Sequence, residues 1–200
     1  MALTRQRVID EAVNLLDEGG LESVTFRKIA DRLGVQSPTL FWHVKNKAAL
    51  VTALSEAILS PTLAAMRPPQ PGERWQSWLT HFSGQLRQAM LAHPDGGRVV
   101  SAAQLSRAMA GLSELAMRTL VDCGLSRHDA RLTVLAVERF TIGHVLEEQA
   151  PRPDEKALAD FDADAFARQH PTVVAAITEY FEPGRTVDDL FRDTLRVILD

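Results

Sequence analysis

A short turn at Gly34 between two segments of helical character constrains this sequence more than any other feature. The hydroxyl of Thr25 is placed to accept a hydrogen bond from a backbone N–H in the first turn of a helix that runs to about Leu33. Gly34 follows the last apolar position of that helix, where a residue without Cβ adopts the left-handed conformation at little cost. Ser37 is expected to cap a second helix with Pro38 at its first position, where the missing N–H costs no hydrogen bond. The pattern predicts a helix-turn-helix.

The N-terminal end of the second helix carries three hydrogen-bonding side chains, Gln36, Ser37 and Thr39. Such side chains are typical of a recognition helix that meets base edges in the major groove of DNA. Residues 23–50 carry five basic side chains and one acidic one, whereas the whole chain has a formal net charge of −4. A basic segment within an acidic protein indicates local phosphate contacts. The alternative is that the lysines are only solvated, and it is disfavoured because turn, cap and basic flank occur together in order.

The turn and second helix contain the run LGVQSPTLFWHVKNKAAL, which is similar to the DNA-binding signature of the TetR family, and specifically of the tetracycline repressors. The resemblance implies an all-α, dimeric protein of about nine to ten helices. Residues 1–46 would form a three-helix DNA-binding domain, and residues 47–200 a ligand-binding and dimerisation domain. Pro38 would open the recognition helix. The family's base contacts would fall on Arg27, Gln36, Ser37, Thr39 and Phe41. Its phosphate contacts would fall on Thr25, Trp42, His43 and Lys47. Ser37 and Phe41 depart from the tetracycline-sensing members, so the operator sequence stays open.

The composition restricts what else the chain can be. With 46% hydrophobic residues among 200, it can bury a core of one or two domains. We see no apolar run near 18 residues and no signal peptide, so we expect no membrane partner. The single cysteine, Cys123, cannot form an internal disulfide and fits a reducing cytoplasm. The sequence shows no nucleophile–base arrangement, phosphate-binding loop or metal-ligand spacing of histidines, so we expect neither an enzyme nor a cofactor or metal.

Helical periodicity fills most of the remaining chain. We expect helices over Thr4–Glu18, from Asn46 to near Pro61, and over Glu73–Ala92, Leu105–Cys123, Ser126–Gln149 and Pro171–Phe181, with a last helix capped by Thr186. The segment Met66–Gly72 is expected to be a linker, Pro94–Gly97 a break or a helix start, Pro183–Gly184 a turn, and the acidic segment Asp154–Asp164 a loop.

Two apolar stripes suggest how the chain associates. They lie on the expected helix Ser126–Gln149 and on the last helix, and they match the pair of helices that forms the family's dimer interface. The alternative is that both stripes serve only the core of one subunit. We favour a homodimer, because one short recognition helix reads few bases and a two-fold dimer places two copies about one DNA turn apart.

The resemblance continues through GERWQSWL, HPDGGRVV and RFTIGHVLEEQ, but the family's magnesium–tetracycline ligands are mostly replaced. Val100 and Ala103 stand at the positions of the magnesium-binding histidine and threonine. Apolar residues stand at three ring-contacting positions, namely Leu63, Phe82 and Ala116. Only the glutamate survives, as Glu147. A hard dication needs oxygen ligands that Val100 and Ala103 cannot offer, so we expect no binding of magnesium–tetracycline.

The pocket positions carried over from the family are mainly apolar. They are Leu63, Phe82, Leu86, Val100, Ala103, Leu105, Met109, Ala116 and Val134. Three polar residues accompany them: Gln104, Arg139 and Glu147. Such a cavity would suit a small, largely apolar effector. Arg139 could pair with an anionic ligand or form an internal salt bridge to Glu138, Glu147 or Glu148. Alternatively, the apolar positions pack together and leave no cavity.

These observations predict a ligand-responsive transcriptional repressor. We expect it to bind double-stranded DNA at a palindromic operator and to be released by a small-molecule effector other than magnesium–tetracycline. The effector would shift the turn near residues 92–103, which pushes on the helix that starts at Asn46. Two alternatives remain open. One is a helical small-molecule-binding protein that retains the DNA-binding part as a remnant, and the other is a DNA-binding regulator without an effector.

Overall fold

The computed structural model describes residues 2–103, 105–182 and 184–200, and every element within these ranges is helical. The chain divides into two compact units, Met1–Gln149 and Ala150–Asp200, which we describe separately. This division follows compactness rather than function. The expected functional boundary between residues 46 and 47 therefore stays a prediction.

The N-terminal helices form what we call the reader. They are α1 (Arg5–Gly19), the short 3-10 helix η1 (Leu21–Ser23), α2 (Phe26–Leu33) and α3 (Ser37–Leu40). As predicted, the Thr25 hydroxyl accepts a hydrogen bond from the Lys28 N–H at 3.2 Å, and Gly34 ends α2 in the left-handed region with φ 66°. The predicted cap of α3 is wrong by one residue. Gln36 occupies the cap position without a side-chain hydrogen bond, and Ser37 begins the helix because its successor, Pro38, fits the first turn.

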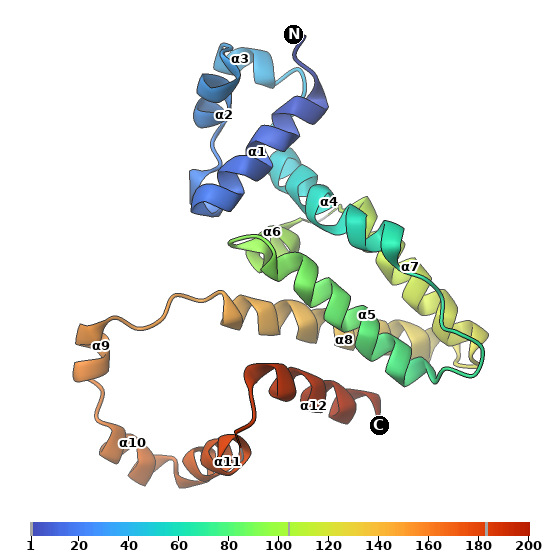
Figure 1. Ribbon diagram of the computed structural model, residues 1–200, viewed down its shortest axis with the longest axis vertical. Coiled ribbons are helices and arrows are strands. Elements are labelled where there is room, and N and C mark those ends of the chain that lie inside the picture. Colours follow the sequence, from blue (N-terminus) through green and yellow to red (C-terminus); the bar gives the residue numbers. More distant parts are fainter. Residues whose placement is uncertain (1, 104, 183) are drawn as a thin grey trace. The chain divides into compact units, whose positions relative to one another are not determined.

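Helix α4 (Lys47–Ala65) leads from the reader into the body of the first unit (Figure 1). The Asn46 side chain caps it, accepting from the Ala49 N–H at 2.8 Å. The expectation that α4 ends near Pro61 is wrong, because the helix continues for one further turn. A proline removes only one backbone hydrogen bond, and Leu63 in that turn is held by packing. A Cβ on Gly111 of α7 would stand 2.6 Å from the Leu63 side chain.

The sequence expectation of no long apolar run also needs correction at α4. This 19-residue helix has a mean hydropathy of 1.5 and is long and apolar enough to cross a membrane. In the structure it packs against α1, α5, α6 and α7. Residues along its length are buried by these contacts, among them Leu50, Leu54 and Leu59. Of its most apolar 18 residues, 33% are buried in this way, so α4 packs into the core along part of its surface.

The body comprises α4 and four further helices of the first unit. These are α5 (Trp75–Leu91), α6 (Gly96–Ala102), α7 (Arg107–Asp122) and α8 (Arg127–Glu148). Helix α8 packs against α5, α6 and α7, so that their apolar stripes meet in one core. The predicted cap of α8 at Ser126 is confirmed, since its hydroxyl accepts from the Asp129 N–H at 3.1 Å. Helix α7 starts later than predicted, after its cap Ser106.

The second unit contains α9 (Glu155–Ala159), α10 (Ala163–Gln169), α11 (Pro171–Phe181) and α12 (Val187–Leu199). The predicted loop over the acidic segment is wrong, because α9 and the start of α10 occupy it. Acidic residues favour helix starts, and the Asp162 carboxylate caps α10 by accepting from the Ala165 N–H at 2.8 Å. The predicted cap of α12 at Thr186 is confirmed, and with Asp189 it forms a reciprocal capping box. The turn expected at Pro183–Gly184 falls partly outside the described residues.

Candidate nucleic-acid interface and ligand site

The recognition helix α3 presents its polar end to solvent. Leu40 at its C-terminal end is fully buried and anchors the helix in the reader. Gln36, Pro38 and Thr39 are exposed, while Ser37 is half-buried. Because a buried leucine fixes the orientation of so short a helix, the exposed side chains before it are held outward. This is the arrangement that direct reading of base edges requires.

Aromatic side chains extend this surface beyond α3. Phe41 stacks on Phe26 with ring centroids 4.8 Å apart and remains 47% exposed. Trp42 is 89% exposed, which is unusual for the largest apolar side chain, whereas His43 beside it is half-buried. Exposed large apolar groups that lie together mark interaction surfaces. The structure thus places Phe41 and Trp42 on a surface that lacks a partner in the isolated chain.

Basic side chains flank the recognition helix, but some are exposed to solvent and others form ion pairs within the protein. Arg27 has an 89% exposed side chain and lies 4.0 Å from Asp31, and Lys47 is exposed at the start of α4. Arg32 pairs instead with Glu18 and Glu11 of α1. Its hydrogen bond lowers the pKa of the Glu18 carboxyl. Arg32 therefore holds α2 on α1, although by charge alone it counted among the basic residues available for DNA.

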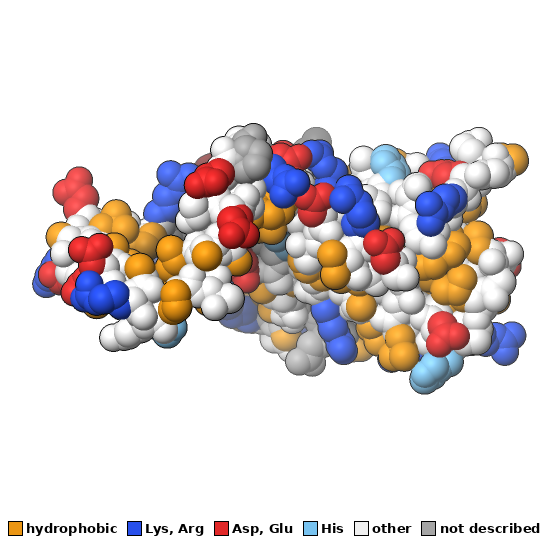
Figure 2. All heavy atoms as spheres, turned by 90° about the horizontal axis from the view of Figure 1, so that it is seen from below, with side chains coloured by type: hydrophobic (Ala, Val, Ile, Leu, Met, Phe, Trp, Pro, Cys, Tyr) orange, Lys and Arg blue, Asp and Glu red, His pale blue; other side chains and the backbone are white. Residues whose placement is uncertain are grey.

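The basic excess belongs to residues 23–50, which carry five basic side chains and one acidic one. On the face of the molecule shown in Figure 2, Lys and Arg side chains alternate with Asp and Glu side chains. No single basic field is visible on that face.

A set of polar contacts, which we call the clasp, joins the body to the reader. Its members are His93, Asp95 and Arg98 on the body and Asp17, Leu21 and Glu22 on the reader. The Leu21 N–H donates to Asp95 Oδ2 at 2.8 Å, and Arg98 bridges Glu22 at 3.0 Å and Asp95 at 3.1 Å. His93 Nδ1 lies 2.6 Å from Asp17 Oδ1. Burial alone would raise the pKa of Asp95, but the donors at Leu21 and Arg98 lower it overall.

The residue that follows α8, Gln149, also contacts the turn between α5 and α6 in which the clasp residues His93 and Asp95 lie. Gln149 Oε1 accepts from the Gly97 N–H at 3.0 Å, and its Nε2 donates to the His93 carbonyl at 2.8 Å. The turn is tight, since a Cβ on Gly96 would stand 2.0 Å from the Met90 carbonyl oxygen. Asp95 adopts a left-handed backbone with φ 59°. A movement of α8 or α6 therefore reaches the reader through few, directional contacts.

A second link joins α4 to α7. The Glu56 carboxylate of α4 accepts from the backbone N–H of Arg107 and, at 3.1 Å, from that of Ala108. These N–H groups belong to the first turn of α7, where no carbonyl of the helix is available to them. Sequence reasoning missed Glu56, Gln149 and the clasp because the contacts that join their separate helices span more than 50 residues of chain.

The predicted effector positions fall into two groups. Five lie in the buried core where α5, α6, α7 and α8 meet, namely Phe82, Leu86, Val100, Ala116 and Val134. Leu63, Ala103 and Met109 are half-buried. Leu105 is 83% exposed. Gln104 lies outside the described residues. The apolar core positions are thus brought together, with their side chains packed.

The polar members of that set behave differently from one another. Arg139 and Glu147 are exposed on α8, and Arg139 makes no ion pair within the described residues. Glu148 pairs with Arg87 of α5 instead, with Nε and Oε2 2.7 Å apart. Glu138 is buried, which raises its pKa despite a hydrogen bond donated by Ser113. Among the residues that the structure describes, no group of three His, Cys, Asp or Glu is placed to hold a metal ion.

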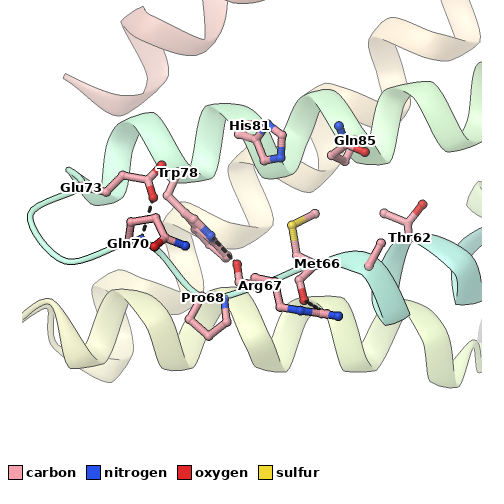
Figure 3. A pocket seen from close by; sticks show the side chains of 10 residues that line it. Thr62, Met66, Arg67, Pro68, Gln70, Glu73, Trp78, His81 and Gln85 are labelled. Carbon is pink, nitrogen blue, oxygen red and sulfur yellow. Dashed lines mark hydrogen bonds between the residues drawn. The ribbon is translucent and has the colours of Figure 1, made fainter.

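Three pockets in the described part of the chain are lined almost entirely by residues other than the predicted effector positions. One, shown in Figure 3, lies between the C-terminal end of α4, the following linker and α5, and has a volume of about 340 Å³. A second borders α1 and α2 near Glu18 and Arg32. The third lies against the start of α4 and includes Leu105, which alone of the predicted effector positions lines any of the three.

Comparison with known proteins agrees with this architecture. A model of the bacterial regulatory proteins of the tetR family matches residues 8–54, and one of the tetracyclin repressor-like C-terminal domain matches residues 68–200. The Escherichia coli class A tetracycline repressor from transposon 1721 is 37% identical over 193 residues, covering 96% of this chain and 87% of that protein.

Solved structures extend the comparison. A TetR variant from Acinetobacter baumannii AYE, in complex with minocycline, has a TM-score of 0.73 and 30% identity, with 99% of this chain and 95% of that chain covered. BioQ with its double-stranded DNA operator has a TM-score of 0.66 and 28% identity, with 76% and 90% covered.

Proposed function

This chain belongs to the TetR family of bacterial transcriptional repressors and is not an enzyme, and from that premise we propose that it binds a palindromic operator as a homodimer and leaves the operator when a small molecule occupies its body. The observation that carries the DNA-binding part is the surface around α3. Its polar residues Gln36 and Thr39, with the 89% exposed Trp42, face solvent on a helix anchored by the buried Leu40. BioQ, a structural neighbour, is seen with its double-stranded DNA operator. In this proposal the bases are contacted by the positions carried over from the family's DNA-binding signature, namely Arg27, Gln36, Ser37, Thr39 and Phe41.

The remaining reader positions contact phosphates in this proposal. These are Thr25, Trp42, His43 and Lys47, which flank the recognition helix on both sides. The Thr25 oxygen already accepts a hydrogen bond from the Lys28 N–H, and its hydroxyl hydrogen remains to donate to a phosphate. Contacts of this kind set the register of a protein on the duplex without reading sequence.

Dimerisation follows from the size of the reader and from exposed apolar side chains. A four-residue recognition helix reads few base pairs, and two copies related by a two-fold axis read both halves of a palindrome. Leu132 on α8 is 55% exposed and Val197 on α12 is 79% exposed. Apolar side chains left in water on these two helices support their use as the interface between subunits.

The body controls the reader through the clasp and through α4 in this account. An effector at the α5–α8 core positions would have to part packed side chains, which moves α6 and the turn that Gln149 holds. The effector acts only to the extent that it binds the moved state more tightly than the resting state. The effector is not magnesium–tetracycline, because Val100 and Ala103 provide no ligand to the metal. Titration of tetracycline fluorescence in the presence of magnesium tests this, and quenching at nanomolar protein would refute it.

Two substitutions test the DNA-binding assignment by their different signatures. Arg27→Ala removes a base contact, so it should cost about 1–3 kcal/mol on the preferred operator and relax sequence preference. Lys47→Ala removes a phosphate contact, so it should weaken binding to all sequences alike and reduce the salt slope by about 1. Anisotropy titrations at several salt concentrations measure both quantities. If both variants bind like the parent chain, the recognition assignment is wrong.

A regulator without an effector is the second candidate, and the tight packing of the predicted core positions favours it. It would bind the same operators through the same residues in the cytoplasm, but no small molecule would release it. A screen for release of labelled operator DNA separates the two candidates, because only the effector-responsive repressor yields a hit.

A further inference from the structure

The pocket at the C-terminal end of α4 offers an open site for a ligand that does not use the packed core (Figure 3). Its volume of about 340 Å³ lies at the lower end of the range for small-molecule sites, about 300–1,000 Å³. None of its lining residues belongs to the effector positions carried over from the family. Met66 and Trp78 give it an apolar wall, and both side chains are more than nine-tenths buried.

The framework of the pocket is fixed by hydrogen bonds among its own residues. The Trp78 Nε1–H donates to the Arg67 carbonyl at 2.8 Å, which ties α5 to the chain just after α4. The Arg67 guanidinium donates to the Ala64 carbonyl at 2.7 Å, and the Glu73 carboxylate accepts from the Gln70 N–H at 2.9 Å. The two charged side chains of the lining therefore have partners, and their formal charges cancel.

On the two helices that face each other across the pocket, three polar side chains have no such partner. Thr62 of α4 and His81 and Gln85 of α5 make no side-chain hydrogen bond within the described part of the chain. His81 and Gln85 are four residues apart on one face of α5, and Figure 3 shows both on the helix that lies opposite Met66 and Thr62. Together they offer a hydroxyl, an imidazole and an amide, which both donate and accept and carry no fixed charge.

We propose that this pocket, in place of the packed core positions between α5 and α8, is the effector site, and that its ligand is a neutral, flat aromatic molecule with hydroxyl groups on its edge. The apolar wall of Met66 and Trp78 suits an aromatic ring, and a methionine adapts to ligands of different shape. The unpartnered groups at Thr62, His81 and Gln85 suit hydroxyls. Arg67 and Glu73 contribute opposite formal charges, so the lining has no net charge that would select an anionic or a cationic ligand. This inference rests on the proposed function for its regulatory role.

The position of the pocket explains how its ligand would reach the DNA. Helix α4 is continuous from Asn46, beside the reader, to Ala65 at the pocket, a length of about 28 Å for 19 residues. A ligand between α4 and α5 displaces the C-terminal end of α4, and the Glu56 contact to α7 acts as the pivot. Trp78 also stacks on Phe82 with centroids 5.6 Å apart, so the pocket adjoins the core without opening it.

Binding is tested with dihydroxynaphthalene as the probe and naphthalene disulfonate as its charged counterpart. The chain has five methionines, so the Met66 methyl signal can be assigned in a ¹³C-methyl spectrum with Met66→Leu. We expect dihydroxynaphthalene to shift that signal and the disulfonate to leave it unchanged. The double variant His81→Ala/Gln85→Ala should weaken binding about tenfold, as the loss of one or two hydrogen bonds implies. Gln88→Ala, also exposed on α5 but outside the lining, serves as the matched control.

Regulation is tested on the full chain bound to its selected operator. Saturating dihydroxynaphthalene should raise the operator dissociation constant at least fivefold, the lower end of usual allosteric coupling of about 5–150-fold. An unmoved Met66 signal, or an affinity unaffected by the double variant, would overturn the site. A shifted signal with unchanged operator affinity would overturn its role as effector site. Failure of the parent chain to bind any operator would overturn the proposed function alone, since the methyl spectrum reports binding without DNA.

Discussion

Removing the Glu56 side chain should destabilise the protein by a predictable amount. Its carboxylate satisfies the N–H groups of Arg107 and Ala108, and the Ser106 hydroxyl satisfies that of Met109 at 3.1 Å. Glu56→Ala leaves two N–H groups at the start of α7 to solvent. Loss of a helix N-cap costs about 0.5–2 kcal/mol, and an anion at this end contributes about 0.3–1 kcal/mol through the helix dipole. Because Glu56 is half-buried, we expect a total of about 1–2 kcal/mol.

The assay is thermal denaturation at fixed protein concentration, followed by circular dichroism. A loss of 1–2 kcal/mol corresponds to a fall in Tm of about 2–8 °C for a chain of this size. Glu56→Gln keeps an acceptor oxygen and should lose about half as much. Glu114→Ala is the matched control, since Glu114 is exposed and forms only a surface pair with Arg118, of about 0–1 kcal/mol. The reasoning is refuted if Glu56→Ala is no less stable than Glu114→Ala.

Three further predictions concern single groups. Burial raises the pKa of Glu138, so the stability that its neutral form contributes is greatest below the ordinary glutamate pKa and is lost as the pH rises. A glutamine has the same shape and stays neutral, so Glu138→Gln should stabilise the fold at pH 7 by about 1 kcal/mol, measured by thermal unfolding. Asp95→Gly suits the left-handed backbone but removes the acceptor of the Leu21 N–H, so hydrogen exchange at Leu21 should accelerate, whereas Asp95→Asn should retain protection. Hydrogen bonds from the Thr186 N–H and hydroxyl and from Arg192 lower the pKa of Asp189 to about 2, so the capping box should persist below the ordinary aspartate pKa of 3.8 and be lost as the pH falls through 2. A carboxyl NMR titration of Asp189 with a midpoint near 4 would contradict that last prediction.

Local signals in the sequence predicted most of the helices. The caps at Thr25, Asn46, Ser126 and Thr186 were identified because a cap depends on residues three or four positions apart. The wrong helix boundaries also follow from reliance on local signals. Pro61 was taken as a helix end, but the packing of Leu63 against α7, which no local pattern shows, carries the helix past it.

The candidate site was less accessible to sequence reasoning. Residues of the DNA-binding surface lie within about 25 positions of one another, so their grouping follows from one motif. The clasp and the Glu56 contact join residues that are more than 50 positions apart, and only the tertiary structure reveals them. The effector positions were carried over by position, and the structure shows five of them packed rather than lining an open pocket. Packing of this kind depends on how neighbouring side chains fill space, which spacing along the chain does not record.

Selection of binding sites from a random DNA library tests the central claim most directly. The account predicts that the parent chain enriches an inverted repeat whose two halves are read by two copies of α3, and that Arg27→Ala broadens the enriched sequences at the position it contacts. Enrichment of no inverted repeat, or the same sequence preference for the parent chain and Arg27→Ala, would contradict a dimeric repressor that reads DNA through this surface.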